Sequence, residues 1–177
     1  MLVAPMAFIP AAERYNLMPQ IDRWVVSSLF ASLKDAHHQI QSLYTVNLSG
    51  ASFNDDRFLD FLKEQFSIYQ IPPQKICFEV TETVAIGNLN KATRFIRQLK
   101  KLGCCFALDD FGTGMSSLAY LKNLPVDYLK IDGHFIRNIV EDPINTAMVE
   151  AINRIGHIMG LQTIAEFVED DAILAKN

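Results

Sequence analysis

The sequence predicts an α/β fold made of consecutive strand–helix–strand units. Short runs of β-branched and aromatic residues alternate with longer segments of helical period, at about 30 residues per unit. The short runs are almost continuously apolar, which is typical of parallel strands covered on both faces. Half of the 177 residues are hydrophobic and 20% are charged, so we expect one globular domain over residues 1–177.

Five runs are expected to form strands, because each is short, apolar and bounded by polar segments. They are Tyr44 to Leu48, Ile76 to Val80, Cys105 to Leu108, Tyr128 to Ile131 and Gln162 to Ala165.

Four intervening segments carry apolar residues at helical spacing. The stripes are Ile21, Val25, Leu29 and Leu33; Phe58, Leu62 and Phe66; Leu89, Ala92, Ile96 and Leu99; and Met148, Ala151, Ile152, Ile155 and Met159. Gly103 and Gly160 follow the last two stripes and are expected to end those helices.

Two architectures fit this alternation, a doubly wound open sheet and a (β/α)₈ barrel. Each predicted strand carries or precedes a polar residue near its C-terminal end: Asn47, Glu79, Asp109 with Asp110, Lys130, and Glu166. A barrel brings these ends together around one mouth, whereas an open sheet spreads them along a line, so the pattern favours the barrel. Only five strands are visible and such a barrel usually needs about 250 residues, so we expect an incomplete barrel.

The strongest local motif runs from Asp109 to Gly114 (DDFGTG). Two adjacent carboxylates leave a strand end and enter a glycine-rich loop. Paired carboxylates suit Mg²⁺ or Mn²⁺, and the glycines suit a close backbone approach to a ligand. The alternative is a solvated, aspartate-rich turn.

Three other charged positions have both a functional and an ordinary interpretation. Glu79 and Glu82 flank a strand end, where they either serve a site or lie on the surface. Lys130 lies within an apolar run, so it either has an anionic neighbour or extends to the rim. Because no histidine stands ready to activate a serine, the residues favour metal-assisted hydrolysis over a nucleophile triad.

Composition excludes several classes of protein. The net charge is −4 and no dense Lys/Arg run is present, so we expect no binding to a DNA or RNA duplex. No apolar stretch approaches the roughly 18 residues of a membrane span, and the N-terminus does not resemble a secretory signal. Three cysteines without a C-x-x-C motif are expected to be reduced thiols in a cytoplasmic chain.

Taken together, the motifs resemble the EAL domain family of bacterial cyclic-di-GMP phosphodiesterases, in family order from about Phe8 to the C-terminus. The matching stretches are Phe8 to Glu13 (FIPAAE), Ile21 to Val25 (IDRWV), Val46 to Ser49 (VNLS), Phe78 to Glu82 (FEVTE), Asp109 to Gly114, Leu124 to Asp132 (LPVDYLKID) and Ala165 to Glu169 (AEFVE). The resemblance implies a modified TIM barrel of the EAL type, of which about five of eight strands are visible here. It also implies a hydrolase in second-messenger signalling that converts cyclic-di-GMP to linear pGpG with two Mg²⁺ or Mn²⁺ ions.

The resemblance also implies roles for individual residues. It makes Asn47, Glu79, Asp109, Asp110 and Glu166 metal ligands, with Asp109 bridging the two ions and Asp109, Lys130 and Glu166 forming the catalytic set. Lys130 would orient or activate the attacking water. Glu82 would anchor the active-site loop, which comprises Phe111, Gly112, Thr113, Gly114, Met115 and Ser116.

The sequence departs from the family pattern in three ways. The Glu-Ala-Leu strand and the closing strand are absent, Phe167 stands where the family usually has glycine, and Met115 replaces an aromatic residue. We therefore expect the chain alone to be poorly active. The alternative is a degenerate EAL domain that binds cyclic-di-GMP without hydrolysis, but the retained metal-site residues favour an enzyme. The expected partners are cyclic-di-GMP, a second copy of the chain, and a fused sensor or GGDEF domain outside it.

Overall fold

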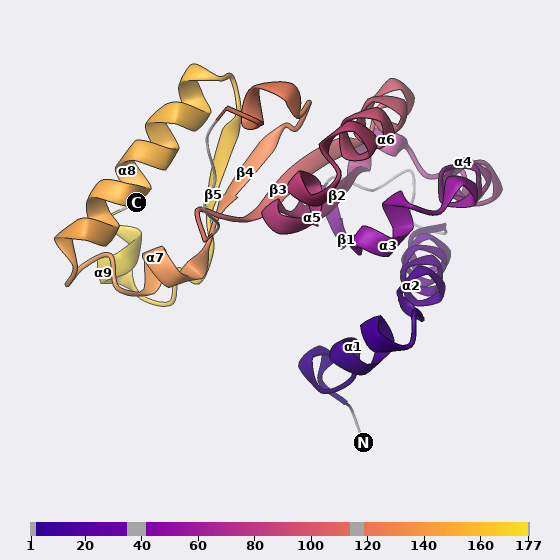
Figure 1. Cartoon of the computed structure of the whole chain (residues 1–177), viewed down its shortest axis with the longest axis horizontal. Helices are drawn as coiled ribbons and strands as arrows, with labels where there is room; N and C mark the ends of the chain where they lie inside the picture. Colours follow the sequence, from indigo (N-terminus) through magenta and orange to yellow (C-terminus); the bar gives the residue numbers. More distant parts are fainter. Residues whose placement is uncertain (1–2, 35–41, 114–118, 177) are drawn as a thin grey trace. The chain divides into compact units, whose positions relative to one another are not determined.

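A computed structural model of the chain describes residues 3–34, 42–113 and 119–176. The predicted strands are all present, as β1 (Tyr44–Asn47), β2 (Ile76–Thr81), β3 (Cys105–Phe111), β4 (Tyr128–Ile131) and β5 (Gln162–Ala165). They form one sheet in the order β1-β2-β3-β4-β5, and the β3–β4 and β4–β5 pairs are parallel (Figure 1). The α/β class and the five strands predicted from the sequence are thereby confirmed.

Helices connect the strands, as the predicted strand–helix–strand units require. The α-helices are α1 (Pro5–Arg14), α2 (Met18–Leu33), α3 (Gly50–Phe53), α4 (Asp56–Tyr69), α5 (Glu82–Gly87), α6 (Leu89–Leu102), α7 (Gly133–Arg137), α8 (Pro143–Ile158) and α9 (Asp171–Leu174). Two 3₁₀ turns, Pro73–Lys75 and Leu121–Asn123, precede β2 and β4.

Contacts divide the chain into two compact units. The first unit comprises Met1–Phe78 and Gln98–Cys105, and the second comprises Glu79–Arg97 and Phe106–Asn177. Each unit has its own packed interior.

In the first unit, α2 packs against α4. The ring of Phe30 lies 4.8 Å from that of Phe66, and the Ser27 hydroxyl donates a hydrogen bond to Gln65 at 2.9 Å. The predicted stripe of α4 is buried. In the predicted stripe of α2, Leu33 is buried, but Ile21, Val25 and Leu29 are only half-buried and the following residue at each of these positions is buried instead. The buried residues of α2 are Met18, Asp22, Val26, Phe30 and Leu33. The cause is Asp22, a carboxylate that occupies a buried position because its hydrogen bonds are made inside the protein.

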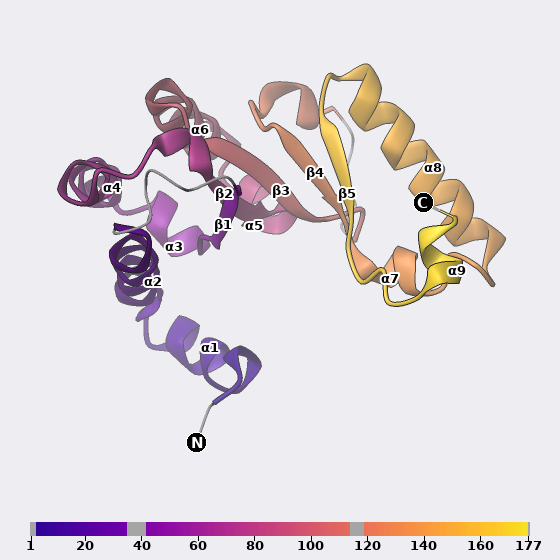
Figure 2. The same cartoon turned by 180° about the vertical axis from the view of Figure 1, so that it is seen from behind.

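In the second unit, α8 packs along β5 and β4, an arrangement visible from both sides (Figures 1 and 2). Of its predicted stripe only Ile152 is buried, and the other buried positions are Asn145, Val149 and Gly156. A Cβ added to Gly156 would lie 2.8 Å from the Thr163 methyl group, so glycine allows helix and strand to approach closely. The packed face of α8 therefore contains a glycine and an amide beside Val149 and Ile152, while Ile144, Met148 and Ile158 are exposed.

Candidate functional site

Lys130, the third residue of β4, lies at the centre of the site. Its ammonium group is 2.9 Å from a carboxylate oxygen of each of Glu79, Asp109 and Glu166. We call these four residues the Lys130 cluster. All of them belong to the second unit, and the Lys130 side chain is only 12% exposed.

Strand geometry explains how residues so distant in sequence meet. Glu79 and Asp109 lie in β2 and β3, and Glu166 directly follows β5. Because the C-terminal ends of parallel strands share one edge of the sheet, polar residues near those ends are brought together. Glu79 is 5% exposed and Asp109 is 9% exposed, so these charges are largely removed from water.

The electrostatics of the cluster are unbalanced. Burial alone would lower the pKa of Lys130, but its hydrogen bonds to the three carboxylates raise that pKa above its usual value. Lys130 is therefore a cation at neutral pH. One ammonium cannot neutralise three carboxylates, so negative charge remains in excess.

Asp110 adds a fourth carboxylate beside the cluster. Carboxylate oxygens of Asp109, Asp110 and Glu166 lie within 4.8 Å of one another. Burial raises the pKa of Asp110, and so do the neighbouring charges of Asp109, Asp132 and Glu166. Its φ of 55° is also disfavoured for a residue with a side chain. Such crowding of acids is what a divalent cation would relieve.

Glu82 lies apart from the cluster and holds a loop. It is the first residue of α5, and its carboxylate accepts hydrogen bonds from the Gly112 amide at 3.1 Å and from the Tyr120 hydroxyl. Gly112 lies near the start of the segment predicted as the active-site loop, and Tyr120 follows that segment. Phe111 is buried, and the Thr113 hydroxyl donates to the Asp110 carbonyl at 3.0 Å.

Two groups of predicted site residues are not among the residues of the Lys130 cluster. Gly114, Met115 and Ser116 lie outside the described residues. Asn47 ends β1 in the first unit, where it is exposed, and its role as a metal ligand stays a prediction.

Sequence reasoning missed two contributors, Asp132 and Tyr120. Asp132 contributes to the raised pKa of Asp110, and its carboxylate accepts a hydrogen bond from the His134 amide at 2.7 Å, which caps α7. Asp132 lies two residues after Lys130, and strand periodicity could have indicated that both face the same side. Tyr120 had no such signal, because nothing in its local sequence pairs it with Glu82.

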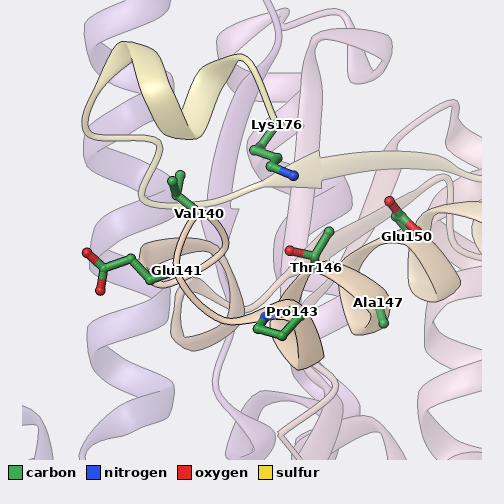
Figure 3. Close-up of a pocket in the computed structure, with 7 residues that line it drawn as sticks. All are labelled: Val140, Glu141, Pro143, Thr146, Ala147, Glu150 and Lys176. Atoms are coloured by element: carbon green, nitrogen blue, oxygen red, sulfur yellow. The ribbon is translucent and has the colours of Figure 1, made fainter.

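A pocket near the start of α8 is unrelated to the cluster (Figure 3). It is lined by Val140, Glu141, Pro143, Thr146, Ala147, Glu150 and Lys176. None of the clustered carboxylates takes part, and its two acidic groups and one ammonium show no concentration of charge. We assign it no role in the chemistry.

In the described part of the chain, none of the helices combines the length and apolar character that crossing a bilayer needs.

Comparison with known proteins agrees with this geometry. The EAL domain family matches residues 1–176, and the chain belongs to this family. A solved structure of the PaMucR phosphodiesterase in complex with c-di-GMP superimposes with a TM-score of 0.91 at 33% identity, covering 98% of this chain and 71% of that chain. The predicted EAL type of TIM-barrel fold is thereby confirmed.

Curated relatives carry the corresponding activity in their names. Cyclic di-GMP phosphodiesterase PdeB of Shewanella oneidensis is 44% identical over 175 residues, which cover 98% of this chain and 20% of PdeB. Cyclic di-GMP phosphodiesterase PdeF of Escherichia coli is 36% identical over 173 residues, covering 97% of this chain and 23% of PdeF. The chain thus spans less than a quarter of the length of these two relatives.

Proposed function

We propose that this EAL domain hydrolyses one phosphodiester bond of cyclic-di-GMP, giving linear pGpG, and that it uses Mg²⁺ or Mn²⁺. The observation that carries the proposal is the excess of carboxylates over cations around Lys130. Three carboxylates contact one ammonium, and a fourth adjoins them. Buried anions in this number are costly unless further positive charge is bound.

The residues present fit divalent cations of the hard type. Glu79, Asp109, Asp110 and Glu166 offer carboxylate oxygens, which Mg²⁺ and Mn²⁺ prefer over nitrogen or sulfur. Asp109, Asp110 and Glu166 would hold the ions together, because their carboxylate oxygens lie within 4.8 Å of one another. Asn47 is proposed as a further ligand. Bound cations would neutralise the phosphate and lower the pKa of the attacking water.

Lys130 has an orienting role in this proposal. Its raised pKa keeps it protonated, so it donates hydrogen bonds and does not accept the proton of the attacking water. It holds Glu79, Asp109 and Glu166 in a fixed arrangement before substrate binds. Water adds to phosphorus, one P–O bond to a ribose oxygen breaks, and the proton lost by water balances the charge on that oxygen.

Glu82 and Tyr120 support the site from the loop. With partners at Gly112 and Tyr120, the Glu82 carboxylate fixes where the loop leaves β3 and where it returns. We propose that these two contacts make Glu82 the anchor of the active-site loop. We propose that the protein acts in a bacterial cytoplasm.

The test is to incubate the purified chain with cyclic-di-GMP and Mn²⁺ and to follow pGpG by anion-exchange chromatography. We expect slow product formation, in keeping with the poor activity expected of the chain alone. This product should depend on Mn²⁺ and fall at least a hundredfold in Asp109→Asn, a loss of about 2.7 kcal/mol in transition-state stabilisation. Equal turnover by wild type and Asp109→Asn would contradict the proposal. Binding of cyclic-di-GMP without any product would instead indicate a non-hydrolytic binding module.

A further inference from the structure

Phe167 directly follows Glu166 and has a backbone conformation that its side chain disfavours. Its φ is 55°, in the left-handed region that glycine adopts readily and bulky residues rarely adopt. The ring is 49% exposed, so general burial does not explain the conformation. Specific contacts of the ring must compensate for the strain.

Those contacts come from α7, the short helix that follows β4. A Cβ added to Gly133 would lie 2.0 Å from Cδ2 and 2.8 Å from Cε2 of the Phe167 ring, so only glycine fits there. The Arg137 guanidinium lies over the ring, 3.8 Å from its centroid, at a distance typical of a cation–π contact. The ring is therefore held between the first and last residues of α7.

This contact joins the two strand ends that carry Lys130 and Glu166. Gly133 follows Lys130 by three residues, and Phe167 follows Glu166 by one. Between the two chain segments, the Glu166 amide donates to the Ile131 carbonyl at 3.4 Å, and Lys130 contacts the Glu166 carboxylate at 2.9 Å. A ring seated on Gly133 thus fixes the distance between these two functional side chains.

We infer that Phe167 and Gly133 form an interlocked pair of positioning residues that holds the Glu166 carboxylate against Lys130. Gly133 is required because Phe167 is present; with glycine at position 167, a side chain at position 133 would be tolerated. The inference rests on the proposed function only in giving Glu166 a role toward a divalent cation. The interlock itself is a property of the metal-free chain.

The test compares Gly133→Ala in the wild-type chain with Gly133→Ala in a Phe167→Gly chain. Alanine is favoured over glycine in helices, and φ of Gly133 is not positive, so alanine alone carries no backbone penalty. With the ring present, we expect Gly133→Ala to lower the unfolding midpoint by about 5 °C. With the ring removed, the same substitution should leave the midpoint unchanged or raise it. Gly87→Ala is the matched control, because a Cβ there meets nothing within 4 Å.

Two further measurements follow the position of Glu166. One is the carboxyl ¹³C resonance of Glu166 in metal-free protein, assigned by its loss in Glu166→Gln. The other is the affinity for Mn²⁺ in a calorimetric titration. We expect Gly133→Ala to shift the resonance and to weaken Mn²⁺ binding about tenfold. Both properties should recover only in part in the double variant, because the Cβ of residue 133 no longer meets the ring but the ring no longer holds Glu166.

Arg137→Ala provides a milder perturbation, since Arg137 is exposed and its loss is compatible with folding. It should shift the Glu166 resonance in the same direction as Gly133→Ala, by a smaller amount. Equal midpoints for wild type and Gly133→Ala would overturn the interlock. A lowered midpoint with an unchanged Glu166 resonance and unchanged Mn²⁺ affinity would show that the ring only packs. Failure of wild type to bind Mn²⁺ would contradict the proposed function, while the resonance would still decide the positioning role.

Discussion

The first and second units each contain buried carboxylates, but they satisfy them in opposite ways. In the first unit, one oxygen of Asp22 accepts hydrogen bonds from the Ser49 amide and from the hydroxyls of Ser49 and Ser52, at 2.9, 2.7 and 2.6 Å. In the second unit, three carboxylates share the single ammonium of Lys130.

The difference separates a structural carboxylate from a functional one. Asp22 has neutral donors of its own, so its site is complete without any ligand. The Lys130 cluster has more negative than positive charge, so its site is completed only when a cation binds. The excess charge costs stability in the absence of metal and becomes binding energy in its presence.

Of the substitutions that test this comparison, Lys130→Met should lower the free energy of unfolding most. Removing the ammonium leaves three carboxylates without a cation, and breaking a buried pair in this way costs about 3 kcal/mol of unfolding free energy. Mn²⁺ should narrow the difference from wild type, because it supplies the missing positive charge. Urea unfolding with and without Mn²⁺ measures both quantities. Lys63→Met is the control, since Lys63 is exposed and its pair with Asp60 lies on the surface.

The difference in unfolding free energy between wild type and Lys130→Met should depend on pH in a defined way. The pKa of Lys130 is raised above 10.5 in the folded protein, so its contribution is fully present below 10.5 and is lost as pH rises through the folded value. The gap between wild type and Lys130→Met should therefore stay constant from pH 7 to about pH 10 and shrink above it. A gap that already falls between pH 7 and 9 would contradict the raised pKa.

Asp22→Ala should have the next largest effect, and it should not respond to metal. The substitution leaves the amide and hydroxyl of Ser49 and the buried hydroxyl of Ser52 without this acceptor, at a cost of about 2 kcal/mol. The loss in unfolding free energy should be the same with and without Mn²⁺. Asp60→Ala, at an exposed position, should change stability by less than about 0.5 kcal/mol. If Mn²⁺ restored the unfolding free energy of Asp22→Ala, the distinction between the two kinds of site would be wrong.

The sequence predicted the strands and the site better than it predicted the helix faces. Strand-end residues such as Glu79 and Lys130 could be found because parallel strands bring their C-terminal ends to one edge of the sheet. The stripe of α4 was correct because its buried face is mostly apolar, with Phe58, Leu62 and Phe66 inward. The stripe of α2 was wrong because Asp22 faces inward, and only Ser49 and Ser52, distant in sequence, make that favourable.

The predicted buried face of α8 was partly wrong for a related reason. Its packed face includes Asn145 and Gly156, whereas Ile144 is 71% exposed. The apolar stripe misses Gly156, because a glycine that allows close packing gives no apolar signal. The Glu82–Tyr120 contact was equally hidden, since it depends on where the chain returns after the loop.

Asp110→Asn should change the free energy of unfolding least. The informative result is whether the substitution stabilises or destabilises the metal-free chain. Burial and the neighbouring Asp109, Asp132 and Glu166 raise the pKa of Asp110, so ionising it opposes folding as pH rises above 3.8. The neutral amide should stabilise the metal-free chain at pH 7 by less than about 1 kcal/mol, since solvent screens this partly exposed group. The same variant should bind Mn²⁺ more weakly. A loss of metal-free stability would show that Asp110 is satisfied within the protein, as Asp22 is.

If divalent cations complete the Lys130 cluster, crystals soaked in Mn²⁺ should contain them there. Anomalous diffraction at a wavelength where manganese scatters strongly locates the ion without reference to activity. We predict anomalous peaks in contact with the carboxylates of Asp109 and Asp110, which disappear in crystals of Asp109→Asn. Saturating Mn²⁺ that leaves no peak at these carboxylates, with Lys130 still contacting all three acids, would contradict the account.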